Sequence, residues 1–183
     1  LFVFLEISSL SSYILISFGK DNRALTASFQ YLIMGTIGAS FYLLGVGYLY
    51  IKTGSLNMFD IHEQLIARGI FDATAVLVAF ILITVGVWIK MAFFPLHAWL
   101  PNSYAYAPTT SSAVLGPLVT KVMIYVMIRL TYTVFGTDYT FGQLDWRDVV
   151  VWMSVAAILV GSISALAQTD LRKMLAYLII AEV

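Results

Sequence analysis

Long runs of apolar residues, separated by short polar stretches, limit what this sequence can fold into. A helix needs about 20 apolar residues to cross the hydrocarbon of a bilayer. Hydrophobic residues make up 61% of the 183 positions and charged residues 11%, which is more apolar surface than a soluble core of this size can bury. Helices satisfy their own backbone hydrogen bonds in lipid, so the sequence predicts an all-α polytopic membrane protein, a bundle of about six transmembrane helices. The expected spans are about 1–18, 24–51, 70–94 with a broken continuation at 95–107, 109–135, 149–167 and an incomplete one at 174–183.

The composition also excludes several classes of site. Ten basic and ten acidic residues cancel, so no overall field favours nucleic acid as a partner. The sequence has no cysteine, which excludes disulfides and cysteine-ligated iron–sulfur clusters from this segment. His62 falls in a polar linker and His97 in an apolar stretch, so a metal or bis-histidine haem site is not expected. We therefore expect no cofactor, no metal and no catalytic residue here, and the lipid bilayer as a partner.

The chain is expected to be an internal piece of a longer protein, with residues 1–183 forming a single transmembrane domain. The first apolar run begins at residue 1, and the last is still apolar close to residue 183. Five polar linkers separate the spans, and with alternating crossings the first, third and fifth lie on one side of the membrane. They are residues 19–24, 52–69, 95–110, 136–148 and 168–173.

Small residues recur inside three of the spans. They lie at 8–12 (SSLSS), 35–40 (GTIGAS) and 161–167 (GSISALA). In lipid, small side chains let two helices approach closely, and hydroxyl groups form hydrogen bonds between helices. Close helix packing is the expected role of these stretches.

One lysine lies in the middle of an apolar run. Lys121 is 12 residues after Thr109 and 14 before Phe135, so each end of the helix is roughly 18–21 Å away, beyond the reach of its side chain. A lysine at the centre of a span costs about 2.5–3.5 kcal/mol on insertion scales, so it needs a partner, a water-filled cavity or a protonation role. Lys121 is either a structural charge paired with another helix or a proton carrier, because desolvation favours the neutral amine and lets it release a proton.

A helix-weakening pair precedes this lysine by one turn. Gly116 and Pro117 are expected to kink or loosen the helix, because proline removes one backbone donor and clashes with the preceding turn. The change would give water or a neighbouring group access to the backbone beside Lys121.

A second lysine, Lys90, lies near the end of the run at 70–94 and shortly before Pro95. If 70–91 is a simple span, Lys90 lies at its end and extends its amine to the membrane surface. Pro95 should instead break the helix, with a continuation to about 107. Broken helices at mid-depth expose polar backbone groups where transporters bind ions, and this arrangement places Lys90 inside the membrane.

Four further ionisable residues are candidates. A lone histidine such as His97 is usually a packing residue, yet an imidazole titrates near neutral pH, which suits a relay between lysines. Glu6 is either an interface residue or, within about 4–6 Å of Lys90, a carboxylate that strengthens proton binding by that lysine. Arg129, near a helix end, and Glu182, near the end of the sequence, are lesser candidates.

The stretch IKMAFFPLHAWLPNSYAYAPTTSSAVLGPLVTKVMIYVMIRL, at 89–130, closely resembles the signature of the antiporter-like proton-conducting membrane subunits. This family is shared by respiratory complex I, where the subunits are of the N, M and L types, by Mrp-type cation/proton antiporters and by membrane-bound hydrogenases. FLEISSLSSYILI and LAQTDLRKMLAY extend the resemblance to essentially the whole chain. LEISSLSSYILIS and LPNSYAYAPTTSSA look most like the Mrp D-type and complex I N-type subunits.

The resemblance implies both a fold and a set of roles. Family members have about fourteen helices in which two five-helix repeats are inverted, so this chain would be the first repeat, about helices five to ten. By position, Glu6 would be the glutamate of the fifth helix, Lys90 the lysine beside the break in the seventh and Lys121 the lysine of the eighth. His97 would be a relay member between the lysines. The chain would then contain an input half-channel and not a complete path.

Several positions depart from the family pattern. Gln30 stands where many relatives have a lysine, Asn102 where aspartate is frequent, and Met123 where glycine is frequent. The residues LII at 178–180 replace a stretch that is commonly serine-rich. These departures leave the three charged positions intact and leave open which complex the chain serves.

The leading hypothesis is a proton-translocating subunit, or one that exchanges Na⁺ for protons, in an NADH:quinone oxidoreductase-like or Mrp-type complex. It would lie in a bacterial or archaeal cell membrane or an organellar inner membrane, beside other membrane subunits that supply the driving change. It would count as an enzyme only as part of such a complex. Two alternatives are a structural membrane subunit whose buried charges are paired, and a secondary transporter of another solute.

Overall fold

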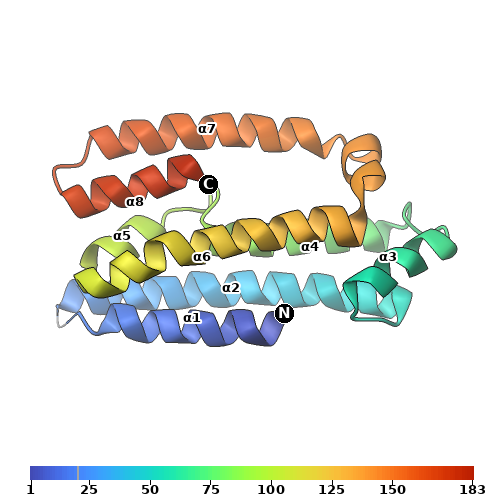
Figure 1. The fold of residues 1–183 in the computed structure, drawn as a ribbon, viewed down its shortest axis with the longest axis horizontal. Helices are drawn as coiled ribbons and strands as arrows, with labels where there is room; N and C mark the ends of the chain where they lie inside the picture. Colours follow the sequence, from blue (N-terminus) through green and yellow to red (C-terminus); the bar gives the residue numbers. More distant parts are fainter. Residues whose placement is uncertain (20) are drawn as a thin grey trace.

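The computed structural model describes residues 1–19 and 21–183 and is a bundle of helices (Figure 1). Within the described residues, four helical stretches are long and apolar enough to cross a membrane, and α1 is a shorter apolar helix. The chain is an integral membrane protein with the predicted all-α fold. Its elements are α1 (Phe2–Ser17), α2 (Asn22–Thr53), α3 (Met58–Ala67), α4 (Thr74–Met91), α5 (Leu100–Tyr106), α6 (Thr109–Arg129), the π-helices η1 (Leu130–Phe135) and η2 (Asp138–Gln143), α7 (Trp146–Leu166) and α8 (Leu171–Glu182).

The long helices run along the long axis of the molecule (Figure 1). One end carries the turns between α1 and α2, between α5 and α6, and between α7 and α8, as alternating crossings predict. Position 20, in the first of these turns, lies outside the described residues. The other end carries α3 and the two π-helices.

Two of the predicted linkers contain helical structure. Residues 58–67 form α3, which begins where the side chain of Asn57 accepts a hydrogen bond from the Phe59 amide at 3.1 Å. Residues 138–143 form η2. The apolar pattern missed both because they are short, with ten and six residues, and because their polar side chains make them resemble loops.

Glycine brings α2 and α4, the most extensive helix pair, into backbone contact. A Cβ atom at Gly86 would lie 2.6 Å from the carbonyl oxygen of Gly38 and 2.7 Å from the backbone nitrogen of Tyr42. Glycine alone allows this approach. At Gly161 in α7, a Cβ atom would lie 2.9 Å from that of Ala181 in α8. Gly38 and Gly161 belong to the small-residue stretches expected to pack closely.

The predicted discontinuous helix is present. α4 ends at Met91, and the chain becomes helical again at Leu100, the start of α5. Trp99 bridges the interruption, because its indole N–H donates to the carbonyl of Ile89 at 3.0 Å. Its ring also stacks on Tyr31 of α2, with 4.4 Å between the ring centroids. The hydrogen bond from Trp99 therefore holds the last turn of α4 at Ile89, the residue before Lys90.

The helix α6 continues without a break past Gly116 and Pro117. Pro117 has no amide hydrogen, so the carbonyl of Ala113 lacks its usual partner within the helix. The loss of this single hydrogen bond does not end the helix, and these two residues therefore do not break it. With η1, the helical run reaches Phe135, where the apolar pattern places its end.

Candidate functional site

Lys90 and Glu6 form an ion pair inside the bundle. Lys90 belongs to the last turn of α4 and Glu6 to α1, 84 positions away. The Lys90 ammonium donates to Glu6 Oε1 and, at 3.1 Å, to the hydroxyl oxygen of Ser9. Lys90 is 7% exposed, so its amine is held by these two side chains and does not extend to the membrane surface. The structure thus supplies a proximity that sequence spacing could not show.

Two different environments meet at Lys90. On the Glu6 side, the space is lined by Phe2, Tyr42 and Val87, among others, and is too tight to admit a water molecule. On the Ser9 side lies a cavity of about 80 Å³, lined in part by Ser8, Ser9 and Tyr31. Most of its other lining residues are apolar, so the serine hydroxyls and the Lys90 ammonium are the groups with which water there can form hydrogen bonds.

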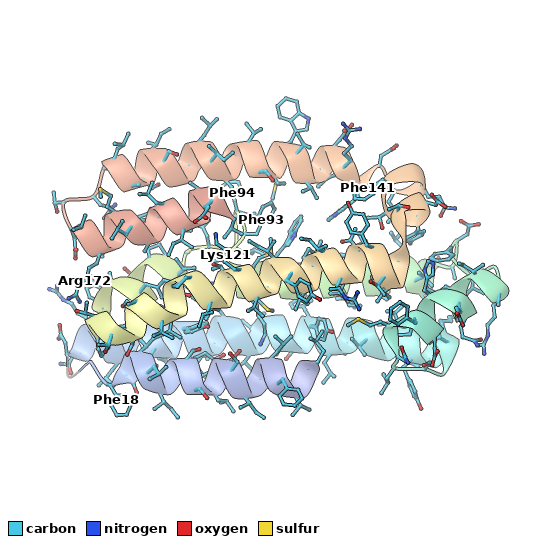
Figure 2. The ribbon with its side chains drawn as sticks, viewed as in Figure 1. Phe18, Phe93, Phe94, Lys121, Phe141 and Arg172 are labelled. Atoms are coloured by element: carbon cyan, nitrogen blue, oxygen red, sulfur yellow. The ribbon has the colours of Figure 1, made fainter. Side chains whose placement is uncertain are left out.

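Lys121 lies near the middle of α6 (Figure 2) and pairs with Glu182 of α8. The distance between Lys121 Nζ and Glu182 Oε1 is 2.9 Å, and the two side chains are 40% and 66% exposed. Both line a cavity of about 600 Å³ between α5, α6 and α8, which also includes Arg172 at the start of α8. Sequence reasoning ranked Glu182 low because it lies at the end of the sequence, although it is the partner that the structure gives to Lys121.

The two lysines occupy separate spaces on different faces of α6. Val119, Val122 and Met123 line the cavity that contains Lys90, whereas Gly116 and Pro117 line the one that contains Lys121. Among the described residues, the two linings have no member in common. A proton that passes from one lysine to the other must therefore cross or go round α6.

His97 lies in the interruption between α4 and α5 and stacks on Phe94, with 5.6 Å between the ring centroids. Its Nδ1 atom is buried and has no hydrogen-bond partner within the described part of the chain. In residues 1–19 and 21–183, no hydrogen bond or ion pair joins His97 to either lysine. A relay role for His97 therefore stays a prediction.

Ser9 is the site residue that sequence reasoning missed. The serines at 8–12 were interpreted as packing residues, and Ser9 proves to be a partner of Lys90. Its position three residues after Glu6 was an available signal, because residues i and i+3 share one face of a helix. In the part of the chain that the structure describes, no cluster of three or more histidine, aspartate or glutamate residues could hold a metal ion.

Residues 1–183 match the family described as NADH:quinone oxidoreductase/Mrp antiporter, transmembrane. The chain belongs to this family. The family prediction from the sequence is thus confirmed. Relatives of both expected types, complex I N-type and Mrp D-type, are similar to this chain. NADH-quinone oxidoreductase subunit N of Desulforudis audaxviator (strain MP104C) is 48% identical over 183 residues, which are 100% of this chain and 36% of that protein. The D-type subunit of the Na⁺/H⁺ antiporter of Bacillus subtilis (strain 168) is 32% identical over the same length, again 36% of the relative.

The same family fold occurs in a solved respiratory complex. A chain of the membrane-bound sulfane sulfur reductase, an archaeal respiratory membrane complex, superposes with a TM-score of 0.86 at 34% identity. The match covers 100% of this chain and 36% of that one. The relatives are subunits of multisubunit membrane complexes, and this chain spans about a third of their length.

Proposed function

We propose that the full-length protein translocates protons across a membrane, either alone or in exchange for Na⁺. It would act as a subunit of an NADH-quinone oxidoreductase-type or a cation/proton antiporter complex. The names of the relatives support both settings. Residues 1–183 would form a single transmembrane domain within it, the first of two inverted repeats.

The buried ion pair beside the helix interruption is the observation that carries this proposal. Lys90 is 7% exposed, and its ammonium contacts the Glu6 carboxylate. A carboxylate at this distance favours the charged lysine, and its withdrawal leaves a desolvated ammonium that favours loss of its proton. A change in a neighbouring subunit that draws Glu6 away would therefore make Lys90 release a proton.

Lys121 would be the next proton-binding group. It lies beside a cavity of about 600 Å³, and its partner Glu182 is mostly exposed. A weakly held ammonium next to open space exchanges protons more readily than a tightly paired one. His97 and water are the proposed connection between the lysines, and Pro95 keeps the helix open there.

The segment would have a limited chemical role within such a complex. We propose that it binds no cofactor and performs no redox step, so it belongs to an enzyme only as a member of the complex. Its partners are the bilayer, other membrane subunits and the transported ions. The membrane would be a bacterial or archaeal cell membrane or an organellar inner membrane.

Replacement of Lys121 tests the function directly. Lys121→Ala in the full-length protein, within its assembled complex, should abolish proton translocation in sealed vesicles. Lys52→Ala is the matched control, because Lys52 is an exposed lysine at the end of α2 and its loss should leave translocation unchanged. Normal translocation by the Lys121 variant would contradict the proposal and favour a structural subunit with paired charges. Uptake of another solute that depends on Lys121 would favour a secondary transporter instead.

A further inference from the structure

Ser9 gives the Lys90 ammonium a second partner with a fixed orientation. The Ser9 hydroxyl donates its own proton to the carbonyl of Leu5, one turn earlier in α1, at 2.8 Å. A serine oxygen has one proton and two lone pairs, so the lone pairs remain for Lys90, whose Nζ lies 3.1 Å away. Ser9 is therefore an acceptor toward Lys90 and is oriented as one by its own helix.

The two partners of Lys90, Glu6 and Ser9, border spaces of different size and polarity. The space next to Glu6 is apolar and too tight for water, so a proton released there has no acceptor other than the carboxylate. The cavity next to Ser9 measures about 80 Å³ and is lined by Ser8, Ser9 and Tyr31 on one side and by residues of α6 on the other. At about 30 Å³ for each water molecule, it has room for about two or three.

We propose that Ser9 is a positioning residue for proton transfer. When the ion pair with Glu6 opens, the Ser9 oxygen keeps the Lys90 ammonium in place and holds it at the edge of the 80 Å³ cavity. One N–H bond of the ammonium then breaks, and the proton passes to a water molecule in that cavity, which leaves a neutral amine and a hydronium ion. Ser9 itself neither gains nor loses a proton. This inference rests on the proposed function and adds the residue that keeps the Lys90 ammonium at the cavity.

Three variants of the full-length protein in its complex test the inference. Ser9→Ala should lower the rate of proton translocation in sealed vesicles about tenfold, the size expected for the loss of a hydrogen bond to a charged group. Ser9→Thr should retain most of the rate, because a threonine hydroxyl can make the same bond to the carbonyl one turn earlier. Ser11→Ala is the matched control: its hydroxyl makes the equivalent bond to Ile7, at 2.8 Å, on the exposed face of the same helix.

The pH profile separates positioning from packing. Without the Ser9 acceptor the Lys90 ammonium loses one of its two partners, so the pH profile should change in Ser9→Ala and stay in place in Ser9→Thr. The other titratable groups that line the spaces beside Lys90 are Glu6 of α1 and Tyr31 and Tyr42 of α2, whereas α6 contributes only apolar residues. All three groups are unchanged in these variants.

The Lys90→Ala and Lys121→Ala variants, measured alongside, distinguish failure of the Ser9 inference from failure of the proposed function. If both abolish translocation while Ser9→Ala behaves as the unmodified protein does, the role of Ser9 is overturned and the proposed function stands. If both lysine variants translocate normally, the proposed function itself fails. Equal losses in Ser9→Ala and Ser9→Thr, or in Ser9→Ala and Ser11→Ala, would also overturn the role of the hydroxyl.

Discussion

The two intramembrane lysines of this chain are each paired with a carboxylate, yet their surroundings differ. The Lys90 and Glu6 side chains are 8% and 28% exposed, and the Lys90 ammonium has Ser9 as a further partner. The Lys121 and Glu182 side chains are 40% and 66% exposed and border a cavity of about 600 Å³. The comparison separates a charge that the fold holds in place from a charge that is free to change partners.

The difference should appear first in stability. A buried ion pair that loses one partner leaves an uncompensated charge, whereas an exposed pair contributes little because water replaces the partner. Lys90→Met should therefore lower the free energy of unfolding by about 3 kcal/mol, and Lys121→Met by less than about 1 kcal/mol. The midpoints of thermal unfolding of the two purified, detergent-solubilised complexes measure this contrast.

A double replacement serves as the control for that prediction. Glu6→Met combined with Lys90→Met removes both charges, and apolar side chains of similar volume often replace a buried pair without loss of stability. The double variant should recover most of the melting temperature that Lys90→Met loses, while translocation stays absent. If it melts as low as the single variant, packing around Lys90 and not its charge determines stability there.

The helix interruption offers a smaller test of how firmly the Lys90 region is held. Trp99→Phe keeps an aromatic ring to stack on Tyr31 and removes the N–H that binds the carbonyl of Ile89. We expect a loss of about 1 kcal/mol in the free energy of unfolding, the usual value of one hydrogen bond. Faster hydrogen exchange at the end of α4 would accompany this loss, and unchanged exchange would show that the indole does not stabilise the interruption.

The smallest effect is expected at the more exposed ion pair, Lys121–Glu182. Glu182→Gln removes the charge that faces Lys121, but the carboxylate is 66% exposed, so stability should change by no more than about 0.5 kcal/mol. The melting temperature should accordingly match that of the unmodified complex. A fall as large as that of Lys90→Met would mean that the second pair is buried in the assembled protein and would remove the contrast between the two lysines.

Much of the fold could be predicted from the sequence because lipid imposes a simple rule. Apolar length defines a crossing helix, so the spans and the interruption near Pro95 were recognisable. The pattern could not find α3, because a short amphipathic helix such as Met58–Ala67 resembles a polar linker. At Pro117 the helix continues, and the expected loosening beside Lys121 stays a prediction.

The candidate site could be predicted only in part. Lys90 and Lys121 were recognisable one by one, because a charge inside an apolar run is costly and needs a reason. Their partners were not, since the contact between Lys90 and Glu6 spans 84 positions and no local pattern records such a distance. The resemblance to the family suggested the Glu6 pairing. The spacing places Ser9 on the same helix face as Glu6, but nothing in the sequence suggested the pairing of Lys121 with Glu182.

The glycine contact between α2 and α4 has a mechanical consequence. Where two backbones touch directly, as at Gly38 and Gly86, no intervening layer of side chains is present to slide or rearrange. Close backbone contact therefore leaves little room for the two helices to shift against each other, and Lys90, on α4, keeps its place relative to α2. Glu6 lies on α1, outside this pair of helices. The ion pair can therefore open by rotation of the Glu6 side chain alone, while the backbone of α1 keeps Ser9 beside the Lys90 ammonium.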